Sequence, residues 1–463
     1  MARLLAGALA LCLSACSAHE GSSTADRIVA KALAPIQPFH VVKLDTVAIA
    51  AAVRGGQVVR LPFVTQDNQL TDKAVRLTPR NLRSPSLANA DVKNGASKTY
   101  RLIRLPPPAT YQGRAEGKEG GGAAIFTVNE RVVEGNILIA QDGWSIIEPL
   151  EPQLRLRGVD AQERETVLRY YNHIVYNVRG QNQRVVVDAD LFQTSRPINK
   201  QTPVAPTPLV VSTVADGDDA FYRAYPPDSV MPFWLKEEAL FNVLDWLFNC
   251  IEPDANPDNA YTRCDNAFDG GANGFHARVR LDRLEVWEAG GPSSVNRDEL
   301  LRQSARETHQ ATPPCCGEPH TAGRSALVFF FSGRTLQPGA GVASVEGLAV
   351  YGDSCFAEED FLCHHALTQV TPSEDFPGNA FFQELLVAHE VGHIIGGAEQ
   401  PNPFAVCWLF GEQCGTNLMG SLRFTSGPNS PIYLYTSDDT LFVMGPLMRQ
   451  RLASPGGKQA EQP

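Results

Sequence analysis

Apolar and polar side chains follow two different periods along this chain. Residues 279–287 alternate apolar and polar positions with a period of two, and residues 325–332 form a short apolar run; both patterns are typical of β-strands. Residues 381–388 instead place Phe, Leu and Ala side chains at helical spacing. The pattern therefore predicts an α+β fold for the C-terminal part of the chain, in which a helix follows the strands.

The N-terminal part is expected to be rich in strands. Residues 25–195 alternate strand-like stretches and show little helical periodicity. Four successive stretches predict a series of hairpins: residues 110–117, 123–128, 133–137 and 144–150. Prolines in the segment that follows favour an extended linker. We therefore expect a β-rich domain over residues 16–195, a proline-rich linker over residues 196–208 and a second domain from residue 209 onward.

Length, composition and charge limit the range of functions. A chain of 463 residues is too long for one ordinary core and predicts two domains with appendages. The formal net charge is −11, and the sequence contains no basic cluster or nucleic-acid-binding motif. These features argue against DNA and RNA as partners and favour a polypeptide.

The first residues predict export. Arg3 precedes an apolar run over residues 4–13, which is too short to span a bilayer as a mature helix. Residues 13–16, Leu-Ser-Ala-Cys, resemble a bacterial lipobox, which implies a signal peptide over residues 1–15 and a lipid anchor on Cys16. The alternative is a plain secretory signal with an incidental cysteine. Both imply export, and the lipobox implies a membrane-anchored protein of the bacterial cell envelope that faces the periplasm or the extracellular space.

Cysteine usage is consistent with export. Apart from Cys16 and one cysteine within the signal, all cysteines lie in the C-terminal part: Cys250, Cys264, Cys315, Cys316, Cys355, Cys363, Cys407 and Cys414. An even number suits disulfide bonds in an oxidising compartment. Three short loops favour local pairing: residues 250–264, 355–363 and 407–414. The neighbours Cys315 and Cys316 leave the connectivity open. A second metal site from three adjacent residues is a further open interpretation: Cys363, His364 and His365.

The strongest chemical signal is a His-Glu-x-x-His sequence at the end of the predicted helix. His389 and His393 are four residues apart, so that on a helix both rings face one side and can bind a single tetrahedral zinc ion. Glu390 lies beside them, where it can act as a general base toward a metal-bound water. Two glycines at residues 396–397 can end the helix and turn the chain back. That turn would bring Glu399 toward the metal.

Together with a downstream methionine, this sequence resembles the metzincin clan of zinc metallopeptidases. The clan's pattern is His-Glu-x-x-His-x-x-Gly-x-x-His followed by a methionine turn, and this chain matches it at His389, Glu390, His393, Gly396 and Met419. At the third ligand position the chain has Glu399, where the family usually has histidine. The resemblance implies a Zn²⁺ cofactor bound by the two histidines and Glu399, with Glu390 as the catalytic base.

Other stretches narrow the resemblance to the adamalysin-like, or reprolysin, branch. Residues 209–216 end in Val-Ala-Asp and are similar to its first strand, and residues 279–287 are similar to its Leu-Glu-Ile-Trp strand. Residues 341–343 and 347–355 are similar to its edge strand, which pairs with extended substrate. The resemblance implies a metzincin catalytic domain over residues 209–453, with a mixed twisted sheet, a long zinc-binding helix and a methionine turn.

The resemblance also implies a substrate pocket and a reaction. The edge strand and a loop after the methionine turn would line the pocket, through Gly347, Leu348, Ala349, Ile432 and Tyr433. The implied reaction is endopeptidase cleavage of proteins, in which zinc polarises the scissile carbonyl and Glu390 passes a proton from water to the leaving nitrogen. The last residues, 454–463, are expected to form a disordered tail.

The β-rich domain resembles a reprolysin-type propeptide. In that family a comparable series of strands ends in Ile-Glu-Pro-Leu, which stands here at residues 147–150, and covers the active site until it is removed. Family propeptides often silence the zinc with a cysteine, but residues 17–249 contain none. Inhibition here would therefore need steric cover or a ligand such as His40 or His173. A β-sandwich spacer is the alternative, and cleavage in the linker would release the catalytic domain from the membrane.

Two other functions stay open. A catalytically inactive lipoprotein on the same fold would use the cleft to bind peptides or to adhere, and the altered ligand Glu399 favours this alternative. An active zinc hydrolase could also cleave a bond other than a peptide bond. Because His389, Glu390 and His393 are all present, zinc-dependent peptide hydrolysis is the main prediction.

Overall fold

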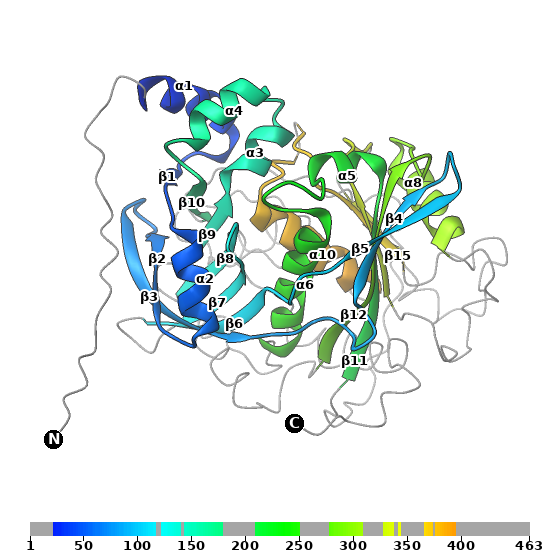
Figure 1. The fold of residues 1–463 in the computed structure, drawn as a ribbon, viewed down its shortest axis with the longest axis horizontal. Coiled ribbons are helices and arrows are strands. Elements are labelled where there is room, and N and C mark those ends of the chain that lie inside the picture. Colours follow the sequence, from blue (N-terminus) through cyan, green and yellow to red (C-terminus); the bar gives the residue numbers. More distant parts are fainter. Residues whose placement is uncertain are drawn as a thin grey trace, which may run out of the picture.

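Two β-sheets with helices between and around them form the described part of the chain (Figure 1). The structure is a computed structural model and describes residues 22–116, 122–139, 143–178, 209–250, 277–308, 327–337, 341–343, 365–373 and 376–394. The predicted α+β class is confirmed.

The first sheet has eight strands, all from the N-terminal half and all antiparallel, in the order β1-β10-β9-β8-β7-β6-β3-β2. The strands are β1 (His40–Val42), β2 (Val59–Val64), β3 (Leu70–Pro79), β6 (Thr110–Ala115), β7 (Gly122–Val128), β8 (Val133–Ile139), β9 (Gly143–Pro149) and β10 (His173–Asn177). The predicted series of hairpins is present as β6 to β9.

This sheet curls so that its edge strand β2 approaches β9 and β10. Ser145 Oγ accepts a hydrogen bond from the Val64 amide at 2.9 Å, and Asn177 Nδ2 donates to the Val64 carbonyl at 2.8 Å. Helix α2 (Thr46–Arg54) packs its apolar residues into the core of the sheet. Asp45 caps α2, because its side chain accepts from the Ala48 amide at 3.0 Å.

The second sheet is mixed and has the order β14-β15-β13-β11-β12-β4-β5. Its C-terminal strands are β11 (Leu209–Gly217), β12 (Ala277–Ala289), β13 (Leu327–Ser332), β14 (Gly341–Ala343) and β15 (His365–Gln369). β12, β11, β13 and β15 are parallel neighbours, and β14 is antiparallel to β15 at one edge. The strands predicted at residues 209–216, 279–287, 325–332 and 341–343 are thus all present.

A hairpin from the N-terminal half completes this second sheet. Strands β4 (Asn89–Asn94) and β5 (Thr99–Arg104) are antiparallel to each other, and β4 pairs in parallel with β12. Asp91 lies opposite Glu285 in that pairing. The N-terminal half and the C-terminal half therefore share one continuous sheet. The domain boundaries expected from the sequence, with a break over residues 196–208, do not include such a shared sheet.

Two long helices separate the sheets. α6 (Phe233–Cys250) and α10 (Ala380–Ile394) lie at the centre of the molecule, and α6 packs against β6 and β7 on one side and β12 on the other (Figure 1). The other helices are α1 (Ser22–Ala32), α3 (Leu150–Leu156), α4 (Ala161–Leu168), α5 (Asp219–Ala224) and α8 (Arg297–Thr308), with a short 3₁₀ turn η1 (Ala34–Ile36). Within the described residues, no helix is long and apolar enough to span a membrane.

Candidate metal centre

The helix that carries the His-Glu-x-x-His sequence begins at a well-defined turn. Gly378 has a positive φ of 64°, and a Cβ there would lie 2.7 Å from the Pro372 nitrogen. The Asn379 side chain then accepts from the Phe382 amide at 3.1 Å, and its carbonyl accepts from the Gln383 amide at 3.1 Å. Local sequence therefore fixes where α10 starts.

One hydrogen bond at this helix start comes from the N-terminal half. Glu148 at the end of β9 accepts from the Ala380 amide at 2.9 Å through Oε2. A carboxylate beside the first amides of a helix satisfies a donor that has no partner within the helix. Glu148 belongs to the Ile-Glu-Pro-Leu stretch, so this stretch directly contacts the helix that carries the motif.

Helix α10 is buried on every side from Ala380 to Val391. It packs against β14, β15, α6 and β9, and its Phe381 ring lies 5.5 Å from the Trp144 ring of β9. A helix that is surrounded in this way must satisfy each of its polar side chains inside the protein. Gln383 Nε2 donates to the Val370 and Gly378 carbonyls, both at 2.9 Å, whereas its Oε1 has no hydrogen-bond partner among the described residues.

The helix places the predicted zinc-binding residues as the spacing requires. It is continuous from Ala380 to Ile394, so positions 389 and 393 lie one turn apart. The His389 and Glu390 side chains are 0% and 1% exposed. An imidazole at a buried position on a complete helix, with a second histidine position one turn later, fits the nitrogen donors that zinc prefers.

The remaining predicted site residues lie outside the described part of the chain. For His393 only the helical backbone is described. The others in this group are Glu399, Met419, Gly347, Leu348, Ala349, Ile432, Tyr433 and Cys16. Among the described side chains, no three His, Cys, Asp or Glu groups come together as a metal-binding set. The third ligand therefore stays a prediction, as does the second metal site, of which only His365 at the start of β15 is described.

The surface between the first sheet and the two central helices is strongly polar. Lys236 of α6 lies 2.7 Å from Glu134 of β8, and both are buried. Asn136 of β8 donates to Glu384 Oε2 of α10 at 2.7 Å. We call this surface, where β8 and β9 meet α6 and α10, the seam. The aromatic pair Trp144 and Trp246, with ring centroids 5.9 Å apart, fills the space beside it.

A second part of α6 binds residues that lie near the ends of β3 and β6. Arg80 donates to Asp245 through Nε at 2.6 Å and through Nη2 at 2.9 Å, and Gln112 donates to the same carboxylate at 3.0 Å. Asp245 also accepts from the Val279 amide of β12 at 2.9 Å. Arg83 also forms an ion pair with a residue of α6, Glu238. α6 thus joins both sheets through buried charge-assisted hydrogen bonds.

The shared sheet has an ionic cluster of its own. Lys93 of β4 lies 2.9 Å from Asp216 of β11 and also pairs with Glu285 of β12. Arg283 donates to Glu285 at 3.1 Å. Burial would lower the pKa of Lys93, but Asp216 and Glu285 outweigh it and raise that pKa above its usual value. Lys93 is therefore charged at all physiological pH values.

The two histidines considered as inhibitory ligands have other roles in the sheet. His40 lies with Nε2 3.0 Å from the Asn68 carbonyl. His173 is buried, with Nδ1 2.8 Å from Asn172 Oδ1 and Nε2 3.4 Å from the Val133 amide. Burial, with a smaller contribution from Lys43, lowers the pKa of His173 to about 3, so that the ring is neutral.

Sequence reasoning missed the residues of the seam. Lys236, Glu237 and Glu238 form a charged run that is typical of an exposed helix surface, yet all three are buried. Their partners in the structure, such as Glu134 and Arg83, are more than 100 residues away in sequence. The long apolar pattern of residues 233–248 was the available signal, because it predicts a helix that is buried on most of its surface.

Comparisons with known proteins add little to this geometry. No protein-family model and no curated protein matches the chain. Among solved structures, one described as "Structure of a chaperone-substrate complex" aligns with 54% of this chain and 32% of its own, at 11% identity and a TM-score of 0.25. A likeness at that level says nothing about the function of this protein. The inference about function therefore rests on the α+β class and on the residues of α10.

Proposed function

We propose that this protein is a zinc-dependent endopeptidase of the metzincin type, similar to the adamalysin branch. The observation that carries the proposal is that His389, Glu390 and position 393 lie on one continuous, buried helix beside a mixed sheet. Strand β14, which the sequence resemblance relates to substrate binding, supports the proposal because it forms the edge of that sheet. An edge strand can pair with an extended peptide through its backbone.

The residues of this chain have defined roles in the proposed reaction. His389, His393 and Glu399 would bind the zinc. A bound zinc would supply an electrophile that polarises the scissile carbonyl and lowers the pKa of a water. Glu390 would accept the proton of the attacking water and donate it to the leaving nitrogen. Met419 would support the metal site from below, and Gly347, Leu348, Ala349, Ile432 and Tyr433 would line the substrate pocket.

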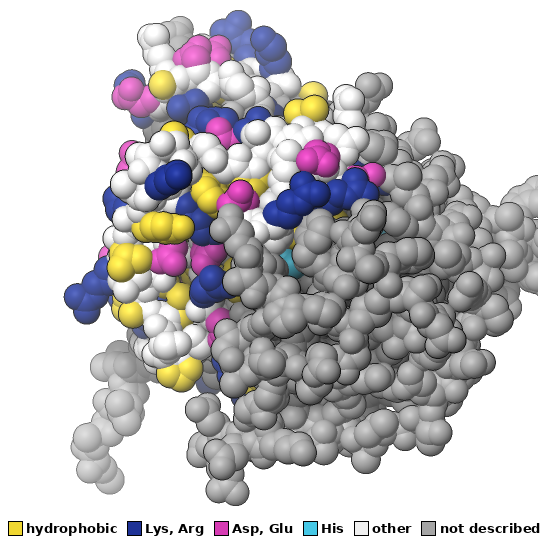
Figure 2. All heavy atoms as spheres, turned by 90° about the vertical axis from the view of Figure 1, so that its right-hand side faces the viewer, with side chains coloured by type: hydrophobic (Ala, Val, Ile, Leu, Met, Phe, Trp, Pro, Cys, Tyr) yellow, Lys and Arg dark blue, Asp and Glu magenta, His cyan; other side chains and the backbone are white. Residues whose placement is uncertain are grey.

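We further propose that the protein is exported and lipid-anchored through Cys16, with the N-terminal half as a cover of the active site. The contacts of Glu148 and Asn136 with α10 support the cover, because they join the two parts at the metal-binding helix. A polypeptide substrate agrees with the net charge of −11. Figure 2 shows Lys and Arg side chains interspersed with Asp and Glu on the described part of one face, a distribution that does not favour nucleic acid.

A binding protein without catalysis is the second candidate. The burial of Glu390, which is 1% exposed, favours it, because a general base must reach its water and its substrate. In that case the protein would have the same fold and would use it to bind peptides or to adhere to a partner. The two candidates differ in whether the protein cleaves a polypeptide and whether Glu390 is needed.

The test is metal content and proteolysis of the exported full-length chain, measured before and after cleavage in the linker of residues 196–208. Proteolysis is expected after that cleavage, because the N-terminal half is proposed to cover the site. We expect one zinc per chain and chelator-sensitive cleavage of a denatured protein. Glu390→Ala should keep the zinc and lose about 100-fold or more in cleavage rate. Glu399→Ala should lose zinc if that residue is the third ligand. Glu165→Gln, an exposed change on α4, is the control and should alter neither property. Zinc without cleavage would favour the binding protein, and absence of zinc would overturn the proposal.

A further inference from the structure

Three buried carboxylates converge on the seam. Glu134 of β8, Glu148 of β9 and Glu384 of α10 are each at most 3% exposed. They act on one another electrostatically, because Glu134 raises the pKa of both other groups and Glu148 also raises that of Glu384. Two cations face them from other elements, Lys236 of α6 and Arg157, which follows α3.

Only one of the three carboxylates has a direct ion pair among these groups. Lys236 Nζ lies 2.7 Å from Glu134 Oε1. Arg157 instead donates to the Pro377 carbonyl at 2.7 Å and to the Gln153 side chain. Two cations against three carboxylates leave one negative charge in excess, in a place where water does not compensate it. A buried excess charge is removed most readily by binding a proton.

The other two carboxylates are bound by neutral donors. Glu148 Oε2 accepts from Gln153 Nε2 and from the Ala380 amide, both at 2.9 Å. Glu384 Oε2 accepts from Asn136 Nδ2 at 2.7 Å. These hydrogen bonds connect β8 and β9 to the first turns of α10, and each of them depends on the position of a carboxyl group that can change its charge.

The local electrostatics agree with a shared proton. Burial, followed by repulsion from Glu134, raises the pKa of Glu148 to about 7 against the opposing effects of Lys236 and Arg157. Burial also raises the pKa of Glu384 to about 8, although Asn136 and Lys236 oppose it. Tyr176 of β10 and Tyr225 face the same groups, and burial raises the pKa of both, that of Tyr225 to about 12. Both tyrosines are therefore neutral in this range.

We propose that the seam is a proton-linked latch on α10, which is closed while Glu148 and Glu384 hold a proton and loosens when both ionise. Ionisation strengthens the bonds that Asn136 and the Ala380 amide donate, but it also leaves two more negative charges buried beside Glu134. Opening, which lets water reach those charges, would separate β8 and β9 from the start of α10, since both bonds cross that boundary. This inference goes beyond the proposed function and does not depend on zinc. If α10 is the zinc helix, the latch makes the cover by the N-terminal half tightest at acidic pH and weaker as the pH rises through neutrality.

The direction of the pH effect follows from the raised pKa values. A group whose pKa is higher in the folded than in the unfolded state stabilises the fold below its unfolded pKa, and this contribution is lost as the pH rises through the folded pKa. For Glu148 and Glu384 the loss extends from about pH 4.5 through about 7 and 8. Weakening of the latch should therefore be measurable between pH 6 and 9.

The experiment is hydrogen exchange of the full-length chain, with chelator present, followed in α10 and β8–β9 and corrected for intrinsic exchange. In the wild type, protection of α10 should fall at least about tenfold from pH 6 to 9, since each proton released gives a factor of ten per pH unit. The variant with both Glu148→Gln and Glu384→Gln carries neutral groups of the same shape. Its protection should change less than about twofold over this range.

Two further variants make the outcome decisive. Glu165→Gln on α4 is the matched exposed control and should keep the wild-type profile. Glu134→Gln removes the like charge and so lowers the folded-state pKa of Glu148 and Glu384. The loss of protection should then end at lower pH and be smaller than in the wild type, and this test holds even if the double variant fails to fold. The same pH profile in the wild type, the double variant and Glu134→Gln would overturn the latch. A zinc-free protein with the expected profile would refute only the proposed function.

Discussion

Two of the buried ionic clusters that join the two halves of the chain have opposite polarity. At the shared sheet the cation Lys93 comes from the N-terminal half, and Asp216 and Glu285 come from the C-terminal half. At the seam the cation Lys236 comes from the C-terminal half, and its partner Glu134 comes from the N-terminal half. The pairs of Lys93 with Asp216 and of Lys236 with Glu134 each take one member from each half, so each half on its own would leave these buried charges unpaired.

The clusters differ in how their carboxylates are neutralised. In the shared sheet Asp216 and Glu285 each have a direct cation, since Glu285 is bound by Lys93 and Arg283, and Asp216 is bound by Lys93. In the seam Glu148 and Glu384 are bound by neutral donors instead. The first cluster should therefore hold at any physiological pH, whereas the second should respond to it. This contrast suggests a permanent join at the hairpin and an adjustable one at α10.

The largest effect is expected from Lys93→Met, which removes the cation of the first cluster and leaves Asp216 and Glu285 buried without it. Breaking a buried ion pair in this way costs about 3–5 kcal/mol in the free energy of unfolding. Urea unfolding of the full chain at pH 7 measures it. Lys31→Met, at the exposed end of α1, should change that free energy by less than about 0.5 kcal/mol. Equal effects of the two changes would show that the hairpin is not a structural join.

The sequence predicts helices and strands with local patterns well, but it does not predict which distant strands pair. Residues 279–287, 325–332 and 381–388 were correctly predicted as two strands and a helix, because their patterns are local and regular. The hairpin of residues 89–104 was not assigned to the second sheet. Strand partners so far apart in sequence leave no local signal, since the same alternation would suit either sheet.

The candidate site shows the same limit. The positions of His389 and Glu390 on a helix followed from the apolar residues at helical spacing in residues 381–388. The four-residue spacing of His389 and His393 then predicts a shared face. Glu148 and Glu384 were not predicted as a linked pair, because a single carboxylate in a sequence is most often exposed. Only the packing of β9 on α10 shows that they are buried together.

A smaller effect is expected from Asn379→Ala, which removes the side-chain cap of α10. The lost hydrogen bond to the Phe382 amide should lower the free energy of unfolding by about 1 kcal/mol. Asp45→Ala removes the equivalent cap of α2 and should cost about the same. Only the change in α10 should also weaken zinc binding, measured by competition with a chelator. Equal zinc affinity in the two variants would show that the cap at the start of α10 does not affect the metal site.

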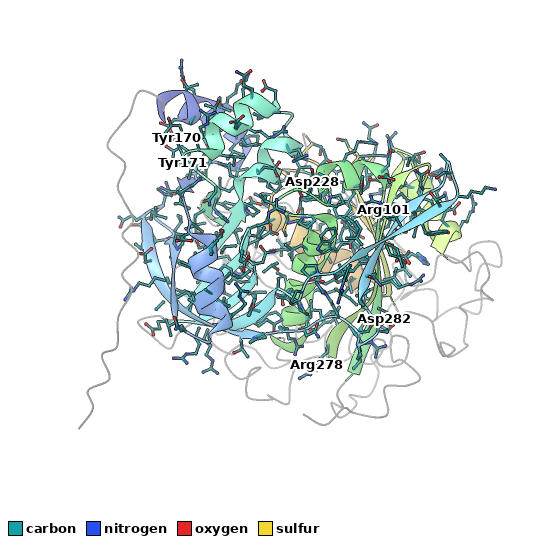
Figure 3. All side chains as sticks on the ribbon, in the orientation of Figure 1. Arg101, Tyr170, Tyr171, Asp228, Arg278 and Asp282 are labelled. Atoms are coloured by element: carbon teal, nitrogen blue, oxygen red, sulfur yellow. The ribbon has the colours of Figure 1, made fainter. Side chains whose placement is uncertain are left out.

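The smallest effect is expected from Arg101→Ala on strand β5, where an exposed ionic contact joins the two halves (Figure 3). Arg101 donates to Glu288 at 3.3 Å and to the Tyr222 hydroxyl at 3.0 Å, but the Arg101 and Glu288 side chains are 52% and 40% exposed. Water and salt screen such a pair, so the expected loss is about 0.2–1 kcal/mol and should shrink at high salt. Arg54→Ala, which breaks an equally exposed pair inside the N-terminal half, should behave alike in urea unfolding. A salt-independent loss of several kcal/mol for Arg101→Ala alone would mean that exposed contacts, rather than the buried Lys93 cluster, hold the hairpin on the second sheet.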